Sequence, residues 1–183
     1  MILTETNLLG AFVVDLERRE DERGFFARSF CRTEFLAAGL RPAVEQMNVS
    51  CTRQAGTVRG MHYQVAPATE SKLVRCTAGA VADIIVDMRA ESPTYLAHFA
   101  VELTAANHRA VYVPPMFAHG HQALVDDCEI TYAVSEAYTV GAERGLRYDD
   151  PALKLPWPLP VAVVSDKDAS WPLLVEQRTV PGS

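Results

Sequence analysis

Short apolar segments separated by turn residues constrain the fold of this chain more than any other feature of its sequence. The segments are rich in β-branched residues and cover positions 11–16, 73–76, 80–88, 97–103, 110–113, 121–125 and 130–134. Residues typical of turns lie between them, as in Glu91-Ser92-Pro93 and Pro114-Pro115. Several short strands at this spacing are typical of a β-sandwich or a β-barrel. The sequence therefore predicts an all-β fold.

Two patterns predict how some of these strands are placed. Segments 73–76 and 80–88 are separated by three residues that end in Gly79, and a glycine-containing gap of this length predicts a hairpin. Phe99 and Leu103 are an even number of positions apart, so they should share one face of a strand.

Helix signals are few. Positions 33–40 predict one short helix, with Thr33 as its N-cap and Gly39 at its end, and a second is predicted near 166–174. The long crossover helices of a parallel nucleotide-binding fold are missing, as are the glycine-rich phosphate-binding motifs.

The length of 183 residues fits one domain. Six of the eleven prolines fall at or after Pro151, and the prolines within 156–160 exclude a regular helix or a central strand there. We therefore predict a single domain over 1–183, with a core over about 11–150 and an extended or helical tail over about 151–183.

The charge balance argues against two classes of partner. The chain has 17 basic and 23 acidic residues, which gives a net charge of −6 and disfavours general nucleic-acid binding. It has no apolar run of about 18 residues, as a membrane span would need, and no secretory signal at its start. We therefore expect a soluble, cytoplasmic protein.

The histidines suggest a site. His119 and His121 are two positions apart and would face the same side of a strand. They could be two metal ligands, with Glu129 or His62 as a third, but the sequence does not force these groups to converge. The alternative is one histidine in a pocket and one that is packed or on the surface.

The segment VRGMHYQ at 58–64 combines several reactive groups. Arg59 has the donor geometry that matches phosphate, and His62 titrates near neutral pH and suits a general base. Strict alternation would place these two side chains on opposite faces of a strand. Both can reach one pocket only if Gly60 marks a bulge or a bend.

A dozen motifs follow one another in an order that points to a known family. They are DERGFF (21–26), QMN (46–48), VRGMHYQ (58–64), SKLVRC (71–76), VADIIVDMR (81–89), ESPTY (91–95), FAHG (117–120), Tyr132, Tyr138, AERG (142–145), DDPAL (149–153) and SDKD (165–168). Together they resemble the dTDP-4-dehydrorhamnose 3,5-epimerase family over about 21–174. The resemblance implies a cupin-type jelly roll, a homodimer and the epimerisation of a nucleoside-diphosphate 4-keto-6-deoxyhexose without metal or cofactor.

The resemblance also implies roles for four residues. His62 would be the base that removes a proton next to the C4 ketone, and Asp168 would orient its ring. Tyr132 would be the acid on the opposite ring face. Lys72 would stabilise the enolate oxygen, and its charge would favour proton transfer from Tyr132.

Other matching positions would bind substrate. Arg23 and Arg59 would hold the diphosphate, and Phe25 or Phe26 would pack on the nucleoside base. The resemblance places six more residues around the substrate: Gln46, Asn48, His119, Tyr138, Glu143 and Lys167. Because His119 is then assigned to the substrate, we expect no metal site.

Four positions depart from the family pattern. Arg28 stands near the nucleotide end where glutamate is common, which leaves a nucleotide other than thymidine diphosphate open. Ala133 and Met116 replace a common lysine and a common glycine, which leaves epimerisation at C3 alone open. His121 stands where an apolar residue is more frequent. Further alternatives are a 3,4-ketoisomerase, a metal-dependent cupin and a binding module without catalysis.

Overall fold

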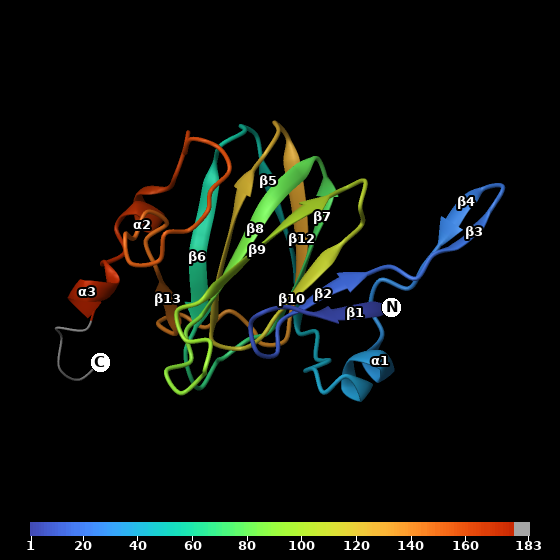
Figure 1. Ribbon diagram of the computed structural model, residues 1–183, viewed down its shortest axis with the longest axis horizontal. Coiled ribbons are helices and arrows are strands. Elements are labelled where there is room, and N and C mark those ends of the chain that lie inside the picture. The colour runs from blue at the N-terminus through green and yellow to red at the C-terminus, as the bar shows by residue number, and fades with distance from the viewer. Residues whose placement is uncertain (178–183) are drawn as a thin grey trace.

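Two antiparallel β-sheets face each other in the computed structural model, which describes residues 1–177 (Figure 1). One sheet has six strands in the order β1 (Ile2–Glu5), β2 (Phe12–Asp15), β10 (Ala110–Val113), β7 (Lys72–Ala78), β12 (Cys128–Val134) and β5 (Gln46–Thr52). The other has five, in the order β13 (Glu143–Gly145), β6 (Val58–Gln64), β11 (Phe117–Ala123), β8 (Ala80–Asp87) and β9 (His98–Thr104). The predicted all-β architecture is confirmed.

Outside the two sheets, the described residues form a hairpin and three short helices. The hairpin pairs β3 (Arg19–Asp21) with β4 (Gly24–Phe26) and projects from the body as an arm (Figure 1). The helices are α1 (Arg32–Ala37), α2 (Asp166–Ala169) and α3 (Leu174–Gln177). No helix in the described part of the chain is long and apolar enough to cross a membrane.

The predicted helices are present with different bounds. Helix α1 begins after Cys31 rather than after Thr33, and no side chain caps it. Gly39 follows the end of α1 with φ of +72°, a left-handed conformation that suits glycine, as predicted. The helix predicted near 166–174 is two separate short helices, α2 and α3.

The hairpin predicted across Gly79 is wrong. Strand β7 pairs with β10 and β12, whereas β8 pairs with β11 and β9, so the two strands belong to different sheets. Gly79 has φ of +71°, and a Cβ on it would lie 3.0 Å from the sulfur of Cys128. This tight turn carries the chain from one sheet to the other, and Cys76 and Val81 then pack in one cluster between the sheets.

The main core fills part of the space between the sheets. It joins apolar residues of both sheets: Val74, Cys76, Val111, Val113 and Ile130 from the six-stranded one, and Val81, Ile85, Leu103, Phe117 and Ala123 from the other. Because alternate residues of a strand share a face, β11 directs His119 and His121 into the same interior as Phe117 and Ala123. The interior therefore continues from an apolar core into a polar region.

The C-terminal segment covers the outer face of the five-stranded sheet. Met61 and Ile84 on that face pack in one cluster with Leu153 and Leu174. The side-chain amide of Gln122 donates to the carbonyl of residue 159 and accepts from its N–H, both at 2.9 Å. The described part of this segment, up to residue 177, lies over the folded body and places α2 beside β6 (Figure 1).

Gly60 forms the predicted bulge in β6. The pairing of β6 with β11 shifts register between His62 opposite His119 and Arg59 opposite His121. Gly60 has φ of +116°, and a Cβ on it would lie 2.6 Å from the Cα of Gly120. The bulge lets Arg59 and His62 face the same side of the sheet, where both line one cavity.

This geometry predicts that Gly60→Ala is strongly destabilising. The new Cβ would meet backbone atoms on β11, so the free energy of unfolding should fall by about 3 kcal/mol, as measured by urea denaturation. Gly39→Ala is the control, because Gly39 also has positive φ but nothing lies within 4 Å of its Cβ position. There the loss should be about 1 kcal/mol. Equal losses in both variants would contradict the crowding at Gly60.

Candidate active site

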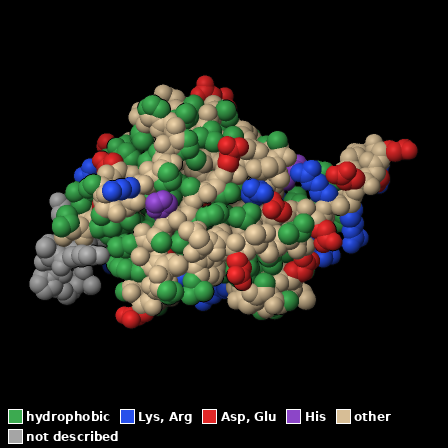
Figure 2. Space-filling model, viewed as in Figure 1, with side chains coloured by type: hydrophobic (Ala, Val, Ile, Leu, Met, Phe, Trp, Pro, Cys, Tyr) green, Lys and Arg blue, Asp and Glu red, His purple; other side chains and the backbone are tan. Residues whose placement is uncertain are grey.

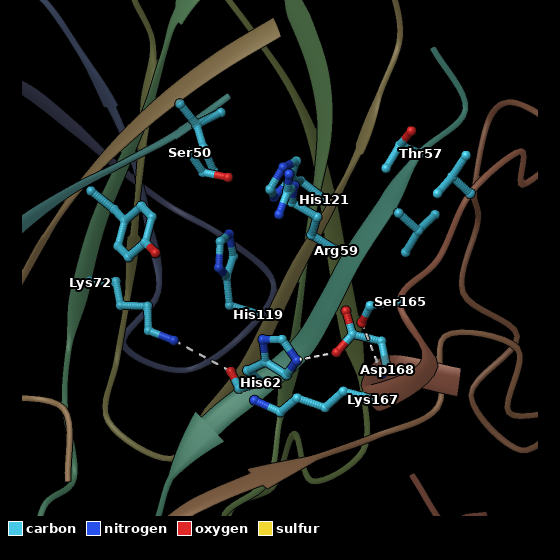
Figure 3. Close-up of a pocket in the computed structure, with 14 residues that line it drawn as sticks. Ser50, Thr57, Arg59, His62, Lys72, His119, His121, Ser165, Lys167 and Asp168 are labelled. Carbon is cyan, nitrogen blue, oxygen red and sulfur yellow. Dashed lines mark hydrogen bonds and ion pairs between the residues drawn. The ribbon is translucent and has the colours of Figure 1, made fainter. Parts of the chain in front are cut away.

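A cavity of about 440 Å³ lies between the sheets, beside the apolar core (Figure 3). Strands β6 and β11 line it from one sheet, and β5, β7 and β12 from the other. Seven of the residues predicted for the site line it: Arg59, His62, Lys72, His119, Tyr132, Lys167 and Asp168. The strand topology therefore brings together groups that are up to about a hundred positions apart in the sequence, such as His62 and Asp168.

His62 and Asp168 form a hydrogen-bonded pair. The Nε2 atom of His62 lies 2.6 Å from Oδ1 of Asp168, and the other carboxylate oxygen accepts a hydrogen bond from the N–H of Gly60 at 3.2 Å (Figure 3). The hydroxyl of Ser165 caps α2 by accepting from the N–H of Asp168. Burial would raise the pKa of the Asp168 carboxyl, but the hydrogen bond and charge of His62 lower it below its usual value. Asp168 is therefore a carboxylate that orients the imidazole.

A second histidine–aspartate pair lies next to it. The Nε2 atom of His119 is 2.7 Å from Oδ2 of Asp83, a carboxylate in the middle of the apolar strand β8. The ring of His121 stacks on that of His119 with their centroids 6.3 Å apart. Burial, reinforced by the nearby charges of His119 and Arg59, lowers the pKa of His121 to about 3. The His121 imidazole is therefore neutral at physiological pH.

A smaller pocket of about 290 Å³ adjoins the cavity and shares three residues with it: His62, Lys72 and Tyr132. The ammonium of Lys72 lies 3.0 Å from a carboxylate oxygen of Glu70 and 3.4 Å from the carbonyl oxygen of His62. These contacts hold the cation at the junction between the two pockets.

The environment of Tyr132 differs from the expected one. Burial raises the pKa of its phenol, the charge of Glu70 adds to the rise, and the charge of Arg59 opposes it. Lys72 is paired with Glu70, so it does not lower the pKa of Tyr132 as the sequence suggested. The phenol of Tyr132, at the junction of the two pockets, therefore keeps its proton to a higher pH than an ordinary tyrosine does.

The smaller pocket contains the other predicted substrate contacts within the body. Gln46, Asn48, Tyr138 and Glu143 line it. The ammonium of Lys167 lies 2.6 Å from a carboxylate oxygen of Glu143, and the hydroxyl of Tyr138 donates to the same carboxylate at 3.5 Å. Gln46 accepts a hydrogen bond from the N–H of Tyr138 at 2.8 Å. These contacts tie the 138–143 loop to β5 and α2.

Arg59 lies where the main cavity meets a third pocket of about 530 Å³, whose lining also includes Arg53 and Gln54. Its guanidinium donates to the hydroxyl of Thr52 and to the carbonyl of Cys51, both at 3.0 Å. Of the cations that line the main cavity in the described chain, Lys72 and Lys167 have carboxylate partners, whereas Arg59 has none. Arg59 is therefore available to an anionic ligand.

The predicted nucleotide-binding residues of the arm lie away from this cavity. Arg23 is 89% exposed in its side chain, and Phe26 is 70% exposed. Phe25, in the middle of β4, packs against His108 of the body, with their ring centroids 5.0 Å apart. Charged side chains of both signs gather along the arm and its base (Figure 2). Within one chain the arm does not join the site.

The departures from the family pattern have distinct structural settings. Arg28 forms an ion pair of 2.8 Å with Glu34, which neutralises the inverted charge. Met116 has φ of +62°, the left-handed region in which glycine is favoured. Ala133 pairs with Met47 and lies on the outer face of its sheet, because its neighbour Tyr132 faces the cavity.

Several contributors to the site were not predicted. Glu70 and Asp83 pair with predicted residues, and the ring of Trp171 contacts that of His62 edge-on at 6.4 Å between centroids. The one signal that the sequence offered for Asp83 is its place in the middle of the otherwise apolar run 80–86. Within residues 1–177, no group of three histidine, cysteine or acidic side chains has the arrangement of a metal site.

Comparison with known proteins identifies the family. The sequence matches the family model for dTDP-4-dehydrorhamnose 3,5-epimerase over residues 5–176. The chain belongs to the dTDP-4-dehydrorhamnose 3,5-epimerase family. Members of this family are named as epimerases, which are isomerases, and their structures are cupin-type jelly rolls, so the predicted family, enzyme class and fold are confirmed.

Three members of the epimerase family illustrate the likeness. A 3,5-epimerase from Sinorhizobium fredii is 42% identical over 157 residues, which cover 85% of this chain and 80% of that protein. A dTDP-4-dehydrorhamnose 3-epimerase from Streptomyces niveus is 34% identical, covering 97% and 86%. The crystal structure of the 3,5-epimerase from Bacillus anthracis, with TDP and PPi bound, has a TM-score of 0.90 and 38% identity, covering 94% and 99%.

The raised pKa of Tyr132 gives a prediction for titration. At pH 10, where an ordinary tyrosine is about half ionised, Tyr132 should be mostly protonated. The difference in tyrosinate absorbance between the native protein and Tyr132→Phe should therefore correspond to less than half of one phenolate. In the denatured proteins the same difference should reach about half. Half ionisation in the native protein would contradict the buried, anion-facing environment.

Proposed function

We propose that this chain epimerises a thymidine-diphosphate 4-keto-6-deoxyhexose at C3 and C5 in deoxysugar biosynthesis, by deprotonation to an enolate and reprotonation, without a cofactor. Family membership supports the reaction and the substrate class. The ketone at C4 acidifies the hydrogens on C3 and C5, so a base, an opposed acid and a positive charge for the enolate oxygen are the chemical requirements.

The observation that carries this proposal is that a histidine and a tyrosine enter the cavity from opposite sheets. His62 belongs to β6 of the five-stranded sheet, and Tyr132 belongs to β12 of the six-stranded sheet. Both line the main cavity and the adjoining pocket. Inversion at carbon needs proton removal on one ring face and proton return on the other. A flat sugar ring between the sheets would meet His62 on one face and Tyr132 on the other.

His62 suits the role of the base. Its Nε2 atom is engaged by Asp168 at 2.6 Å, which favours the tautomer with a proton on Nε2 and an available lone pair on Nδ1. The carboxylate also stabilises the imidazolium that forms when Nδ1 takes the substrate proton. Lys72 lies at the same junction and would stabilise the enolate oxygen, because its ammonium is held there by Glu70.

The nucleotide end of the substrate would extend from the sugar towards Arg59. Arg59 lies between the main cavity and the third pocket, without a carboxylate partner in the described chain, and its guanidinium matches a diphosphate. Thymidine diphosphate is the nucleotide named in the relatives and bound in the Bacillus anthracis structure. Because Glu34 pairs with Arg28, the inverted charge at that position gives little reason to expect another nucleotide.

We further propose that the active form is a homodimer in which each arm completes the site of the partner. Arg23 and Phe26 are expected to bind nucleotide, yet both are exposed and neither lines the cavity of its own chain. They belong to an arm that projects from the body (Figure 1). The outer face of β5 also exposes Met47 by 72% and Val49 by 63%, as an interface between copies would require. A second copy that covers this face could bring its arm to the nucleotide.

Solvent exchange followed by proton NMR tests the reaction. In deuterated water with thymidine-diphosphate 4-keto-6-deoxyglucose, the wild-type enzyme should incorporate deuterium at both C3 and C5 and form the inverted product. His62→Asn should reduce exchange at both positions by about 100-fold or more, because the base is lost. Tyr132→Phe should reduce inversion by a similar factor but retain exchange, because His62 can still remove a proton and return a deuteron to the same face.

The controls are His98→Asn on β9 and Tyr95→Phe, two residues that line neither pocket, and both variants should retain wild-type rates. Full activity of His62→Asn would refute the proposed base. Exchange at C3 alone would assign the narrower activity of a 3-epimerase, which the likeness to the Streptomyces niveus protein makes the second candidate. Absence of any exchange by the wild type would refute the proposed reaction.

The crossed arms predict that two inactive variants complement each other. Arg23→Ala removes an arm function, and His62→Asn removes the base. A mixed dimer would contain one intact site, made from the arm of the His62→Asn copy and the base of the Arg23→Ala copy. Co-expression should therefore restore about a quarter of the wild-type activity if the two copies assort at random. If each arm served its own chain, no activity would return, and the crossed arrangement would be refuted.

A further inference from the structure

His121 is an unusual side chain for the wall of a cavity. It is 4% exposed, it lines the main cavity, and neither of its ring nitrogens hydrogen-bonds to any group in residues 1–177. In the described part of the chain, the fully buried side-chain polar atoms without a partner are Asp83 Oδ1 and Trp171 Nε1, so the unpaired nitrogens of His121 are not sealed off and remain accessible from the cavity. The other histidine of this strand, His119, has its partner in Asp83. The arrangement indicates that His121 is kept for a group of the ligand.

The hydrogen-bonding capacity of His121 indicates which kind of ligand group it could bind. A neutral imidazole offers one N–H donor and one acceptor nitrogen. Phosphate oxygens only accept, and they would satisfy one of the two nitrogens. An apolar methyl group would satisfy neither. A single hydroxyl also reaches only one of the nitrogens, but because it can donate or accept it can pair with whichever nitrogen faces the ligand, which a phosphate oxygen cannot do. The hydroxyl is therefore the sugar substituent that best matches this ring.

The position of His121 indicates which hydroxyl of the sugar it would contact. In the pairing of β11 with β6, His119 lies opposite His62, and His121 lies opposite Arg59. His121 is therefore farther along the strand from the proposed base, and it is next to the proposed diphosphate contact. Figure 3 shows His119 between His62 and His121. In the hexose, C1 bears the diphosphate and C3 is a reacting carbon. The hydroxyl between them is the one on C2.

We propose that His121 hydrogen-bonds the C2 hydroxyl of the sugar and makes this enzyme selective for 2-hydroxy over 2-deoxy substrates. The inference rests on the proposed function, because it assumes that the sugar lies at the junction of His62 and Tyr132 and the diphosphate at Arg59. It assigns to His121 the role of a specificity-determining residue that takes no part in proton transfer.

The test compares two substrates, the thymidine-diphosphate 4-keto sugars of 6-deoxyglucose and of 2,6-dideoxyglucose. The wild type should prefer the 2-hydroxy sugar in kcat/KM by about tenfold or more, because the 2-deoxy sugar leaves the imidazole unpaired. In His121→Phe this preference should fall to about threefold or less, chiefly through a lower kcat/KM for the 2-hydroxy sugar. His121→Asn, which keeps a donor and an acceptor, should retain part of the preference.

Two further measurements separate this role from others. The affinity for TDP alone should be unchanged in both variants, because the nucleotide lacks the sugar hydroxyl; a loss would show that His121 serves the diphosphate and would overturn the proposal. His98→Phe is the control, a substitution of the same kind outside the cavity. An equal loss of kcat/KM on both substrates in His121→Phe would also overturn the proposal. If the variants fail to fold, the wild-type preference decides, and an equal rate on both sugars refutes the role of His121 while leaving the epimerase proposal standing.

Discussion

The rest of the site depends on the two hydrogen bonds that the carboxylate of Asp168 accepts. One oxygen fixes the ring of His62, and the other binds the N–H of Gly60, the residue whose bulge lets Arg59 share a cavity with His62. The carboxylate comes from a C-terminal segment held on the five-stranded sheet by apolar packing around Leu174. Through these two hydrogen bonds, the C-terminal segment contributes to the tautomer of His62, the proposed base, and to the backbone geometry of its strand.

The second constraint is that one interior holds both the core and the cavity. Charged groups that leave water for such an interior need partners, and most of those in the two adjoining pockets have them: Lys72 with Glu70, Lys167 with Glu143, His62 with Asp168, and His119 with Asp83. Among the described residues that line the main cavity, Arg59 and His121 differ from these paired groups. One is a cation without a carboxylate, and the other is a neutral ring without a hydrogen bond. These are the groups that a ligand with a diphosphate and a hydroxyl would complement.

Much of this arrangement could be predicted from the sequence, because alternation and turn residues report local structure. They indicated most strands and the bulge at Gly60, and the ordered motifs indicated the family. Long-range placement was beyond them. Alternation gives the faces of β7 and β8 but not their neighbours, so the turn at Gly79 was misread as a hairpin. The projection of the arm that carries Arg23 away from the body, and the pairing of Asp83 with His119, likewise depend on tertiary packing that local patterns do not encode.

The environment of Tyr132 is compatible with its proposed role as the acid, even though the pKa of its phenol is raised rather than lowered. A carbon next to a ketone, once deprotonated, is a stronger base than a phenolate, so even a phenol with a raised pKa can protonate it. In the proposed mechanism the phenolate that results would face the charge of Glu70 in a buried site, which would raise its energy and speed recovery of the proton. At neutral pH the phenol is therefore always protonated when substrate binds. On the opposite side, the lowered pKa of Asp168 keeps its carboxyl ionised, so that it can hold the ring of His62, the proposed base, in place.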